Sequence, residues 1–344
     1  MNRIKILIVD DSAFARKVLR EILEGSDQIQ VVGAARDGEE ALEMAGNLLP
    51  DLVICDLHMP HLDGVSFVRR QMATRPLPIL IVSAAAQDAS EVIEALSAGA
   101  IDVIQKPSAL ATDDLRLVRA RLMDKVMEAM QVPRSNLRVT DLPLRNHHRP
   151  STVTGNVEVV VMGVSTGGPQ ALRRLLPLFP RDFPVPIAMV LHMPVGYTAL
   201  YAEKLNEQCA IEVKEAADGD AMLPGRALLA VAGRHLTFRR DGGGRVLAHL
   251  SLQPLDKIHR PSVDVLFRSA AEVYEDKVLA IVMTGMGDDG TEGAAWVKAQ
   301  GGAVLTESEK SCIIYGMPRS VAEAGLSDLA VPLDEMAEAI MARL

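Results

Sequence analysis

Aromatic residues are scarce in this chain of 344 residues, at 3% of the total. Its hydrophobic cores must therefore be aliphatic, and few aromatic side chains are left on which nucleic-acid bases could stack. Basic residues are also outnumbered by acidic ones, which gives a formal net charge of −9. That charge offers no electrostatic reason to bind nucleic acid or an anionic membrane, so we expect neither nucleic-acid partners nor direct membrane insertion.

Cysteine is sparse as well, with only Cys55, Cys209 and Cys312 in the sequence. An odd, scattered set of this kind predicts reduced thiols and no disulfide framework, and no cysteine–histidine spacing indicates zinc. No apolar run is long enough to cross a bilayer, and the opening residues 1–9 predict no signal peptide. These absences together predict a cytoplasmic protein.

Hydrophobic residues make up 49% of the chain, and its length suits two domains that each bury a core. Over the first 125 residues, short apolar runs alternate with amphipathic helical segments. The predicted strands are Ile4–Val9, Gln30–Ala35, Asp51–Cys55, Ile79–Val82 and Ile101–Ile104. Strands that are apolar throughout are typical of a parallel sheet covered on both faces, so residues 1–125 predict an α/β, doubly wound (βα)5 domain.

The pattern collapses after this domain, where prolines, arginines and histidines replace the apolar periodicity between Val132 and Asn156. We interpret residues 126–156 as an exposed interdomain linker. A second α/β region over 157–344 predicts a Rossmann-like, mostly parallel domain, with a hairpin around Asp241–Gly244. Its predicted strands include Val157–Met162, Ile187–Leu191, Val278–Met283 and Ala303–Thr306.

Polar side chains follow successive strands of the first domain. Asp10 and Asp11 follow the first strand, Asp56 the third, Ser83 the fourth and Lys106 the fifth. Because ligands bind outside the carboxyl ends of such strands, these five side chains are predicted to converge in one crevice. Three crowded carboxylates repel one another, and a hard divalent cation, Mg²⁺, relieves that repulsion.

This arrangement predicts a phosphorylation site. Asp56 would attack a phosphoryl group as a carboxylate nucleophile, with Asp10 and Asp11 completing the metal site. Lys106 would neutralise the charge that develops on the phosphate, and the Ser83 hydroxyl would hydrogen-bond a phosphate oxygen.

The first domain resembles the receiver domains of two-component response regulators. The matching stretches are Val9–Ser12, Cys55–Pro60, Asp63–Gly64, Val82–Ala84 and Gln105–Pro107. The resemblance implies that a sensor histidine kinase phosphorylates Asp56 and that Asp10 and Asp11 help to bind Mg²⁺. Val103 departs from the pattern, because many receivers have a Phe or Tyr there that responds to phosphorylation.

The second domain contains a serine on a glycine-rich turn. Gly163–Gly168 follows a predicted strand, opens a helix and matches G-x-S-x-G with Ser165 at its centre. The flanking glycines permit a sharp turn, and the helix N-terminus supplies N–H groups suited to an oxyanion. A dinucleotide fingerprint is the competing interpretation, but Ser165 occupies the place of its middle glycine and would obstruct a pyrophosphate.

A nucleophilic serine needs a base, and the base needs an orienting acceptor. His192 follows the next predicted strand, and Asp288 and Asp289 follow a later one, so all are expected at one sheet edge. His235 and His259 are rival bases. His235 precedes a predicted hairpin strand away from this edge, whereas His259 lies at a helix start and could line the cleft.

The second domain resembles the catalytic domain of chemotaxis protein-glutamate methylesterases. The matching stretches are Gly163–Gly168, His192–Pro194, Val213–Ala216, His259–Asp264, Thr284–Gly290 and Gly316–Pro318. The resemblance implies that Ser165 is the nucleophile, His192 the base and Asp289 the orienting acid. It also places Met286, with an N–H for the oxyanion, together with Thr166 and His259 in the cleft. The family commonly has Asn where this chain has Asp288, which leaves the choice between Asp288 and Asp289 open.

The two resemblances imply one function. Phosphorylation would control a hydrolase that removes γ-methyl esters from chemoreceptor glutamates and deamidates receptor glutamines, with no cofactor for the ester reaction. The unphosphorylated receiver would restrict access to Ser165. Two other classes of protein are the competing hypotheses. One is a docking module with an inert hydrolase site, and the other is a DNA-binding response regulator. The negative charge and the lack of a basic helix-turn-helix count against the latter.

Overall fold

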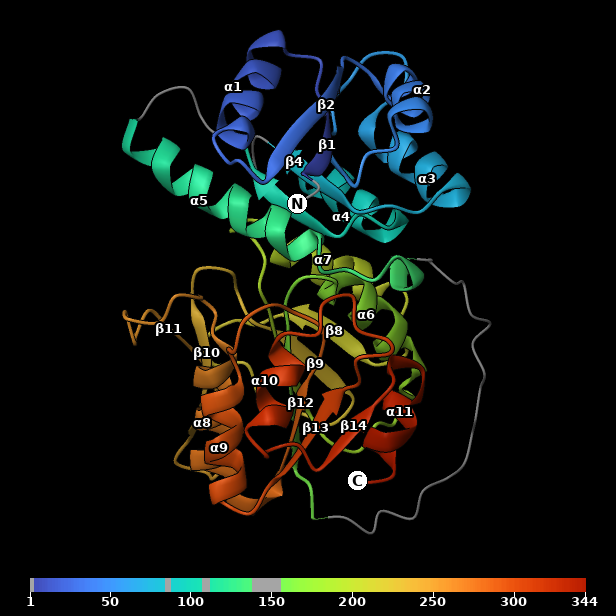
Figure 1. The fold of residues 1–344 in the computed structure, drawn as a ribbon. Coiled ribbons are helices and arrows are strands. Elements are labelled where there is room, and N and C mark those ends of the chain that lie inside the picture. Colours follow the sequence, from blue (N-terminus) through green and yellow to red (C-terminus); the bar gives the residue numbers. More distant parts are fainter. Residues whose placement is uncertain (1–2, 84–87, 107–111, 138–155) are drawn as a thin grey trace. The chain divides into compact units, whose positions relative to one another are not determined.

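The computed structural model describes residues 3–83, 88–106, 112–137 and 156–344. The chain divides into two compact units, Met1–Asp141 and Leu142–Leu344, each with its own sheet (Figure 1). Among the described residues, every helix is too short or too polar to span a lipid bilayer.

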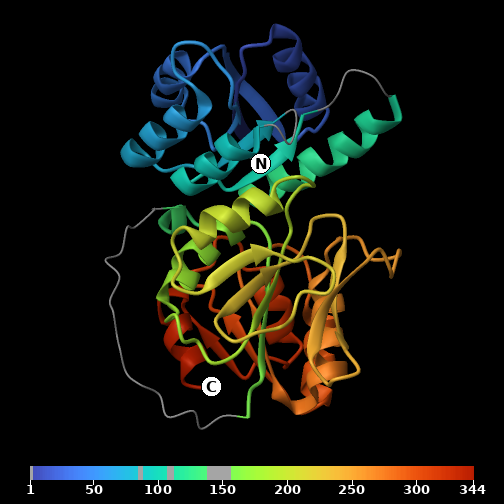
Figure 2. The same ribbon diagram turned by 180° about the vertical axis from the view of Figure 1, so that it is seen from behind.

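The first unit contains a five-stranded parallel sheet with the strand order β2-β1-β3-β4-β5. Helices α1 and α5 lie on one side of this sheet, and α2, α3 and α4 lie on the other (Figures 1 and 2). This is the predicted doubly wound (βα)5 arrangement. Its elements are β1 Ile4–Val9, α1 Ala13–Glu24, β2 Ile29–Ala35, α2 Gly38–Leu48, β3 Leu52–Asp56, α3 Gly64–Thr74, β4 Ile79–Ser83, α4 Ala89–Ala98, β5 Asp102–Gln105 and α5 Thr112–Ala129.

Local sequence explains where these elements begin. Strands β3 and β4 are buried at every position, which requires the unbroken apolar runs that the sequence has there. Ser12, Asp37 and Asp63 cap α1, α2 and α3, each accepting a hydrogen bond from a backbone N–H three residues later. Because β1 and β3 pair in parallel, the polar residues at their carboxyl ends lie at one rim of the sheet.

The second unit contains a seven-stranded parallel sheet with the order β14-β13-β12-β6-β7-β9-β8, and a separate antiparallel hairpin of β10 and β11. Its elements are β6 Val159–Val164, α6 Gly168–Leu175, β7 Ile187–Leu191, α7 Thr198–Asn206, β8 Glu212–Glu215, β9 Arg226–Leu229, β10 His235–Arg240, β11 Val246–Ser251, α8 Val263–Tyr274, β12 Val278–Val282, α9 Thr291–Ala299, β13 Ala303–Glu307, α10 Met317–Glu323, β14 Leu329–Val331 and α11 Leu333–Met341. Short 3-10 turns span Leu176–Leu178 and Glu275–Lys277.

One face of the larger sheet carries the main core of this unit. Helices α8, α9 and α10 cover that face with the β10–β11 hairpin, while α6 and α11 pack together on the opposite face (Figures 1 and 2). The buried residues of the core are aliphatic apart from Phe238, Phe267 and Tyr274. Strand β6 lies between β7 and β12, so the chain winds outward from it in both directions. Ligand sites of open α/β sheets lie at such switch points.

Three features differ from the sequence-based expectation. Helix α5 continues to Ala129 and a 3-10 turn spans Arg134–Leu137, so the early part of the predicted linker is structured. Val132 and Leu137 are buried there, which explains why this part does not behave as an exposed tether. Helix α10 and strand β14 were not predicted, because both are short. The rest of the predicted linker, 138–155, lies outside the described residues.

Candidate functional site

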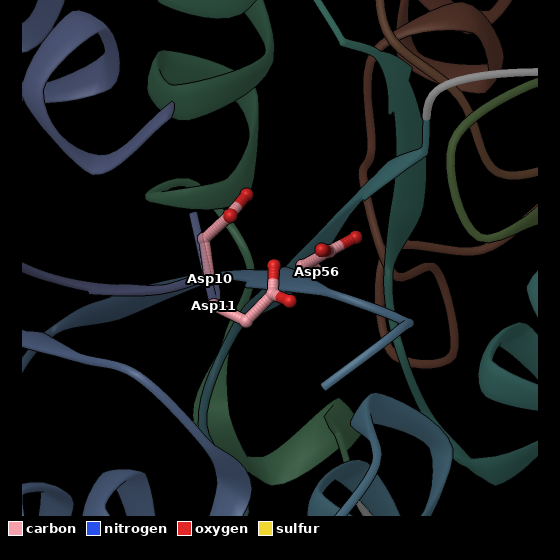
Figure 3. Close-up of side chains that lie close together, drawn as sticks. All are labelled: Asp10, Asp11 and Asp56. Atoms are coloured by element: carbon pink, nitrogen blue, oxygen red, sulfur yellow. The ribbon is translucent and has the colours of Figure 1, made fainter. Parts of the chain in front are cut away.

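The first cluster of polar residues lies at the rim where β1 and β3 end. Asp10 and Asp11 follow β1, Asp56 is the last residue of β3, and the two strands pair directly. Figure 3 shows the three carboxylates gathered at these neighbouring strand ends. An oxygen of each lies within 4.8 Å of an oxygen of the others. The structure thus brings together the residues that the sequence selected for a metal ion.

Lys106 extends into this cluster from the end of β5. Its Nζ lies 2.9 Å from Asp10 Oδ2 and 2.7 Å from Asp56 Oδ2. Burial alone would lower the pKa of the Lys106 ammonium, but the two carboxylates raise it above its ordinary value. The lysine is therefore a permanent cation beside Asp56.

Asp56 combines burial with a nearby positive charge. Burial raises the pKa of its carboxyl above the ordinary value, and Lys106 partly opposes that shift. The backbone N–H of Leu57 donates to Asp56 Oδ1 at 2.8 Å. One carboxylate oxygen is thus held by the backbone and the other by Lys106, which orients the group at the crevice.

Ser83 ends β4, as expected, but its hydroxyl already has a partner. It donates to Asp88 Oδ2 at 2.7 Å, while Asp88 Oδ1 lies 3.0 Å from His58 Nε2. Asp88 directly precedes α4, yet its side chain makes no capping hydrogen bond. Its carboxylate interacts instead with two side chains beside the acidic cluster. Val103 is buried in β5, where no aromatic ring is available.

The second cluster lies at the ends of three adjacent strands in the second unit. Val164 pairs with Leu191 and Gly163 with Val282, so β6, β7 and β12 end side by side. Ser165 and His192 come directly after the paired residues on strands about 4.8 Å apart. The N–H of His192 donates to Val164 O at 3.1 Å, so the hydrogen bonding between β6 and β7 extends as far as His192.

His192 and Asp289 interact directly. Nε2 of the histidine lies 2.9 Å from Oδ2 of the aspartate, and both side chains are about one-tenth exposed, at 10% and 9%. An ionised carboxylate only accepts hydrogen bonds, so Nε2 carries the hydrogen and Nδ1 holds the free lone pair. Nδ1 is buried and has no hydrogen-bond partner among the described residues. It is the nitrogen of this ring that can take a proton.

The N-terminus of α8 holds the Asp289 carboxylate in place. The backbone N–H groups of Val263 and Asp264 donate to it at 2.8 and 3.0 Å, and the Ser262 hydroxyl donates at 2.8 Å. Burial would raise the pKa of Asp289, but His192 and these N–H donors hold it well below the ordinary value. Asp289 is therefore ionised at neutral pH.

The neighbouring Asp288 makes none of these contacts and is exposed. Only Asp289 faces the imidazole, which distinguishes the two carboxylates that the sequence left open.

The two rival histidines have different surroundings. His235 is buried, accepts from Ser262 N at Nδ1 and lies 3.1 Å from Pro254 O at Nε2, so both ring nitrogens are engaged. Burial lowers the pKa of its imidazole, which keeps it neutral. It lies beside Ser262 and not away from this edge as expected. His259 stacks on His192 with ring centroids 4.1 Å apart.

The serine turn is packed closely from two sides. Gly167 has φ +79°, a conformation that suits glycine, and a Cβ there would lie 2.5 Å from Ile313 Cβ. A Cβ on Gly285 would lie 2.7 Å from Ser165 Cβ. Thr166 is buried in the turn, and Met286 is half-buried in the loop after Gly285. Thr166 thus lies within the Ser165 turn, and Met286 directly follows Gly285, which packs against that turn.

Sequence reasoning missed several residues of this site. It noted Ser262 and Asp264 within a matching stretch but did not connect them with Asp289. No role was predicted for Thr284, which hydrogen-bonds the serine turn, or for Glu307, which hydrogen-bonds Thr284. A polar residue at the end of each buried strand is the signal that could have found Thr284 and Glu307, because such positions meet at one rim.

Comparison with known families assigns each unit. The CheB methylesterase family model matches residues 160–340, and the response regulator receiver domain model matches residues 6–117. The chain is 46% identical to protein-glutamate methylesterase/protein-glutamine glutaminase 5 of Myxococcus xanthus, over 98% of this chain and 97% of that protein. It is 42% identical to the protein-glutamate methylesterase/protein-glutamine glutaminase of Halalkalibacterium halodurans, over 99% and 98% respectively.

A solved structure supports the assignment of the second unit. The crystal structure of the Thermotoga maritima CheB methylesterase catalytic domain matches with a TM-score of 0.53 and 40% identity. The match covers 55% of this chain and 99% of that structure.

Proposed function

The chain belongs to the CheB methylesterase family, and from this we propose that it is a phosphorylation-controlled protein-glutamate methylesterase and protein-glutamine glutaminase of a chemosensory pathway. Its substrates would be methylated chemoreceptors, and its phosphodonor a sensor histidine kinase. The observation that carries the proposal is the His192–Asp289 pair at the strand ends beside Ser165. The three free cysteines agree with a reducing, cytoplasmic setting.

The ester reaction follows from the order of these groups. His192 Nδ1 takes the proton of the Ser165 hydroxyl as the serine oxygen bonds to the γ-carbonyl carbon of the methylated glutamate. Asp289 stabilises the imidazolium that forms and keeps the ring oriented. Backbone N–H groups of the cleft, with Thr166 and Met286 as candidates, stabilise the tetrahedral oxyanion.

Collapse of this intermediate breaks the bond to the methoxy group. The leaving methanol takes the proton from His192, and an acyl-enzyme remains on Ser165. Water then attacks the acyl carbon while His192 accepts its proton, and the serine leaves with that proton restored. A glutamine side chain follows the same route with ammonia as the leaving group. Because an amide leaves less readily than an ester alkoxide, deamidation is expected to be slower.

The first unit would supply the control. Asp10, Asp11 and Asp56 fit a magnesium ion, because hard divalent cations prefer oxygen ligands and these residues place theirs within 4.8 Å of one another. When bound, Mg²⁺ would neutralise charge on the phosphoryl group during its transfer. Asp56 forms the new bond to phosphorus as the bond to the donor breaks. Lys106, already 2.7 Å from Asp56, would then pair with the phosphoryl oxygens.

The test is methanol release from methylated receptor by the full chain, with and without a small phosphodonor. We expect Ser165→Ala to abolish methanol release both with and without the phosphodonor. In the wild type, the phosphodonor should raise methanol release. A docking module with an inert hydrolase site would show the same signal in the wild type and in Ser165→Ala, and that result would exclude the proposed enzyme.

A further inference from the structure

Thr284 lies two residues after β12 and is 1% exposed. Its carbonyl accepts a hydrogen bond from Ser165 N at 3.0 Å. Its hydroxyl donates to Thr166 O at 2.9 Å and accepts from Ile314 N at 2.9 Å. A single buried side chain and its own carbonyl therefore hold two consecutive residues of the serine turn.

Glu307 anchors Thr284 from the other side. It is the last residue of β13, next to β12, and its carboxylate is fully buried. Glu307 Oε2 accepts from Thr284 N at 2.9 Å, and Oε1 accepts from the Ser311 hydroxyl at 2.8 Å. No lysine, arginine or histidine in the described ranges forms an ion pair with it. Burial raises the pKa of the Glu307 carboxyl above its ordinary value, and the hydrogen bonds from Thr284, Ser311 and Cys312, with the charge of Arg174 farther away, oppose that rise.

Hydrogen bonds connect Glu307 to the serine turn through Thr284. The carboxylate holds the N–H of Thr284, and Thr284 in turn holds the backbone of Ser165 and Thr166. All the bonds are between buried groups, where water cannot replace a partner that is lost. A change at either residue would therefore move the serine turn relative to His192.

We propose that Thr284 and Glu307 are a positioning pair that sets the place of the Ser165 hydroxyl in the reaction. The inference rests on the proposed function, because it assumes that Ser165 is the nucleophile. Neither residue would touch substrate. Their contribution would lie in kcat and not in KM, since they act on the geometry of the attack and not on receptor binding.

Matched variants separate the hydroxyl from the shape of Thr284. Thr284→Val keeps the branched shape but removes the hydrogen bonds of the hydroxyl to Thr166 O and Ile314 N. Thr284→Ser keeps the hydroxyl and loses one methyl group. A misplacement on the order of 1 Å can cost about 10²-fold in rate, so we expect Thr284→Val to lower kcat by roughly 10- to 100-fold. KM should stay within about threefold of the wild type, and Thr284→Ser should recover most of kcat.

Glu307 offers a second matched pair. The amide oxygen of Glu307→Gln can still accept from Thr284 N, and its NH₂ can donate to the Ser311 oxygen. Glu307→Ala removes the acceptor and opens a cavity. We expect Glu307→Gln to retain kcat and Glu307→Ala to lose it, and this pair keeps the inference testable if Thr284→Val fails to fold.

The experiment uses the full chain and two readouts. Methanol release from methylated receptor gives kcat and KM, and the rate at which a fluorophosphonate modifies Ser165, with loss of fluoride, reports the nucleophile without receptor. Thermal unfolding of every variant separates lost positioning from lost stability.

The expected result is a parallel fall in kcat and labelling rate for Thr284→Val and Glu307→Ala, with recovery in Thr284→Ser and Glu307→Gln. Unchanged labelling in Thr284→Val and Glu307→Ala, or equal losses within each matched pair, would overturn the positioning role. So would a wild type whose Ser165 is not labelled. If Ser165 is labelled normally but no methanol is released, the proposed function fails while the positioning pair remains supported.

Discussion

Replacement of Asp289 by asparagine tests the core of the site with little change in size. In the wild type, Oδ2 faces His192 Nε2 and Val263 N, and Oδ1 faces Ser262 Oγ and Asp264 N. Asparagine has one acceptor oxygen and one NH₂ group. In either orientation, the NH₂ meets a backbone N–H where an acceptor is required. With the NH₂ toward His192, the imidazole must adopt the other tautomer, and Nδ1 can no longer act as the base.

The expected magnitude follows from that tautomer. The equivalent replacement in a serine protease triad lowers kcat about 10⁴-fold, which we also expect for Asp289→Asn. At 1.36 kcal/mol for each tenfold change, this corresponds to about 5.4 kcal/mol of transition-state stabilisation. Loss of the hydrogen bonds to a charged, buried acceptor should lower the free energy of unfolding by about 1–3 kcal/mol. The catalytic loss should therefore far exceed the loss in stability.

The assay is methanol release from methylated receptor together with thermal unfolding. Asp288→Asn is the matched control, because Asp288 is adjacent in sequence, exposed and without contact to His192. It should retain nearly full activity. Activity of Asp289→Asn within tenfold of the wild type, or a comparable loss in Asp288→Asn, would refute the assignment of Asp289 as the orienting acid.

The same variant carries a pH signature. The pKa of Asp289 is lower in the folded protein than in the unfolded chain, so its carboxylate stabilises the fold at pH values above the unfolded pKa of about 3.9. That contribution is lost as the pH falls through the folded pKa. The stability difference between wild type and Asp289→Asn should thus be full at neutral pH and shrink below about pH 4 in acid-unfolding measurements.

Three further outcomes are expected. Asp56→Asn should take up no phosphate from a labelled small phosphodonor, and the phosphodonor should no longer raise its methanol release. As the control, Asp27→Asn changes an exposed aspartate and should behave as the wild type. Phosphate uptake by Asp56→Asn would exclude Asp56 as the only acceptor. Asp88→Ala should be phosphorylated several-fold faster, because it removes the hydrogen bond between the Ser83 hydroxyl and Asp88 together with a negative charge. Unchanged phosphorylation kinetics would show that this contact has no effect. Gly285→Ala should lower kcat at least about tenfold, because the Cβ of the new alanine would displace the nucleophilic serine. A normal kcat in a normally folded variant would contradict this close packing.

Much of the first unit follows from local pattern. Apolar runs such as Leu52–Asp56 are buried on both faces, so their periodicity indicates parallel strands directly. Asp10, Asp56 and Lys106 then meet because parallel strands share one carboxyl edge. The Ser83–Asp88 hydrogen bond was not predictable, because local periodicity does not show that the residue before α4 meets the last residue of β4.

The sequence by itself determined which strand ends carry chemistry. Ser165 and His192 follow strands whose order along the chain is also their order in the sheet, so their proximity needed only the rule for parallel strands. Tertiary structure alone decided the rest. Asp289 was distinguished from Asp288 by the N-terminus of α8, and Thr284 was joined to Glu307 by the pairing of β12 with β13. Such contacts depend on how elements that are distant in sequence pack together. The local periodicity of a sequence carries no information about that packing.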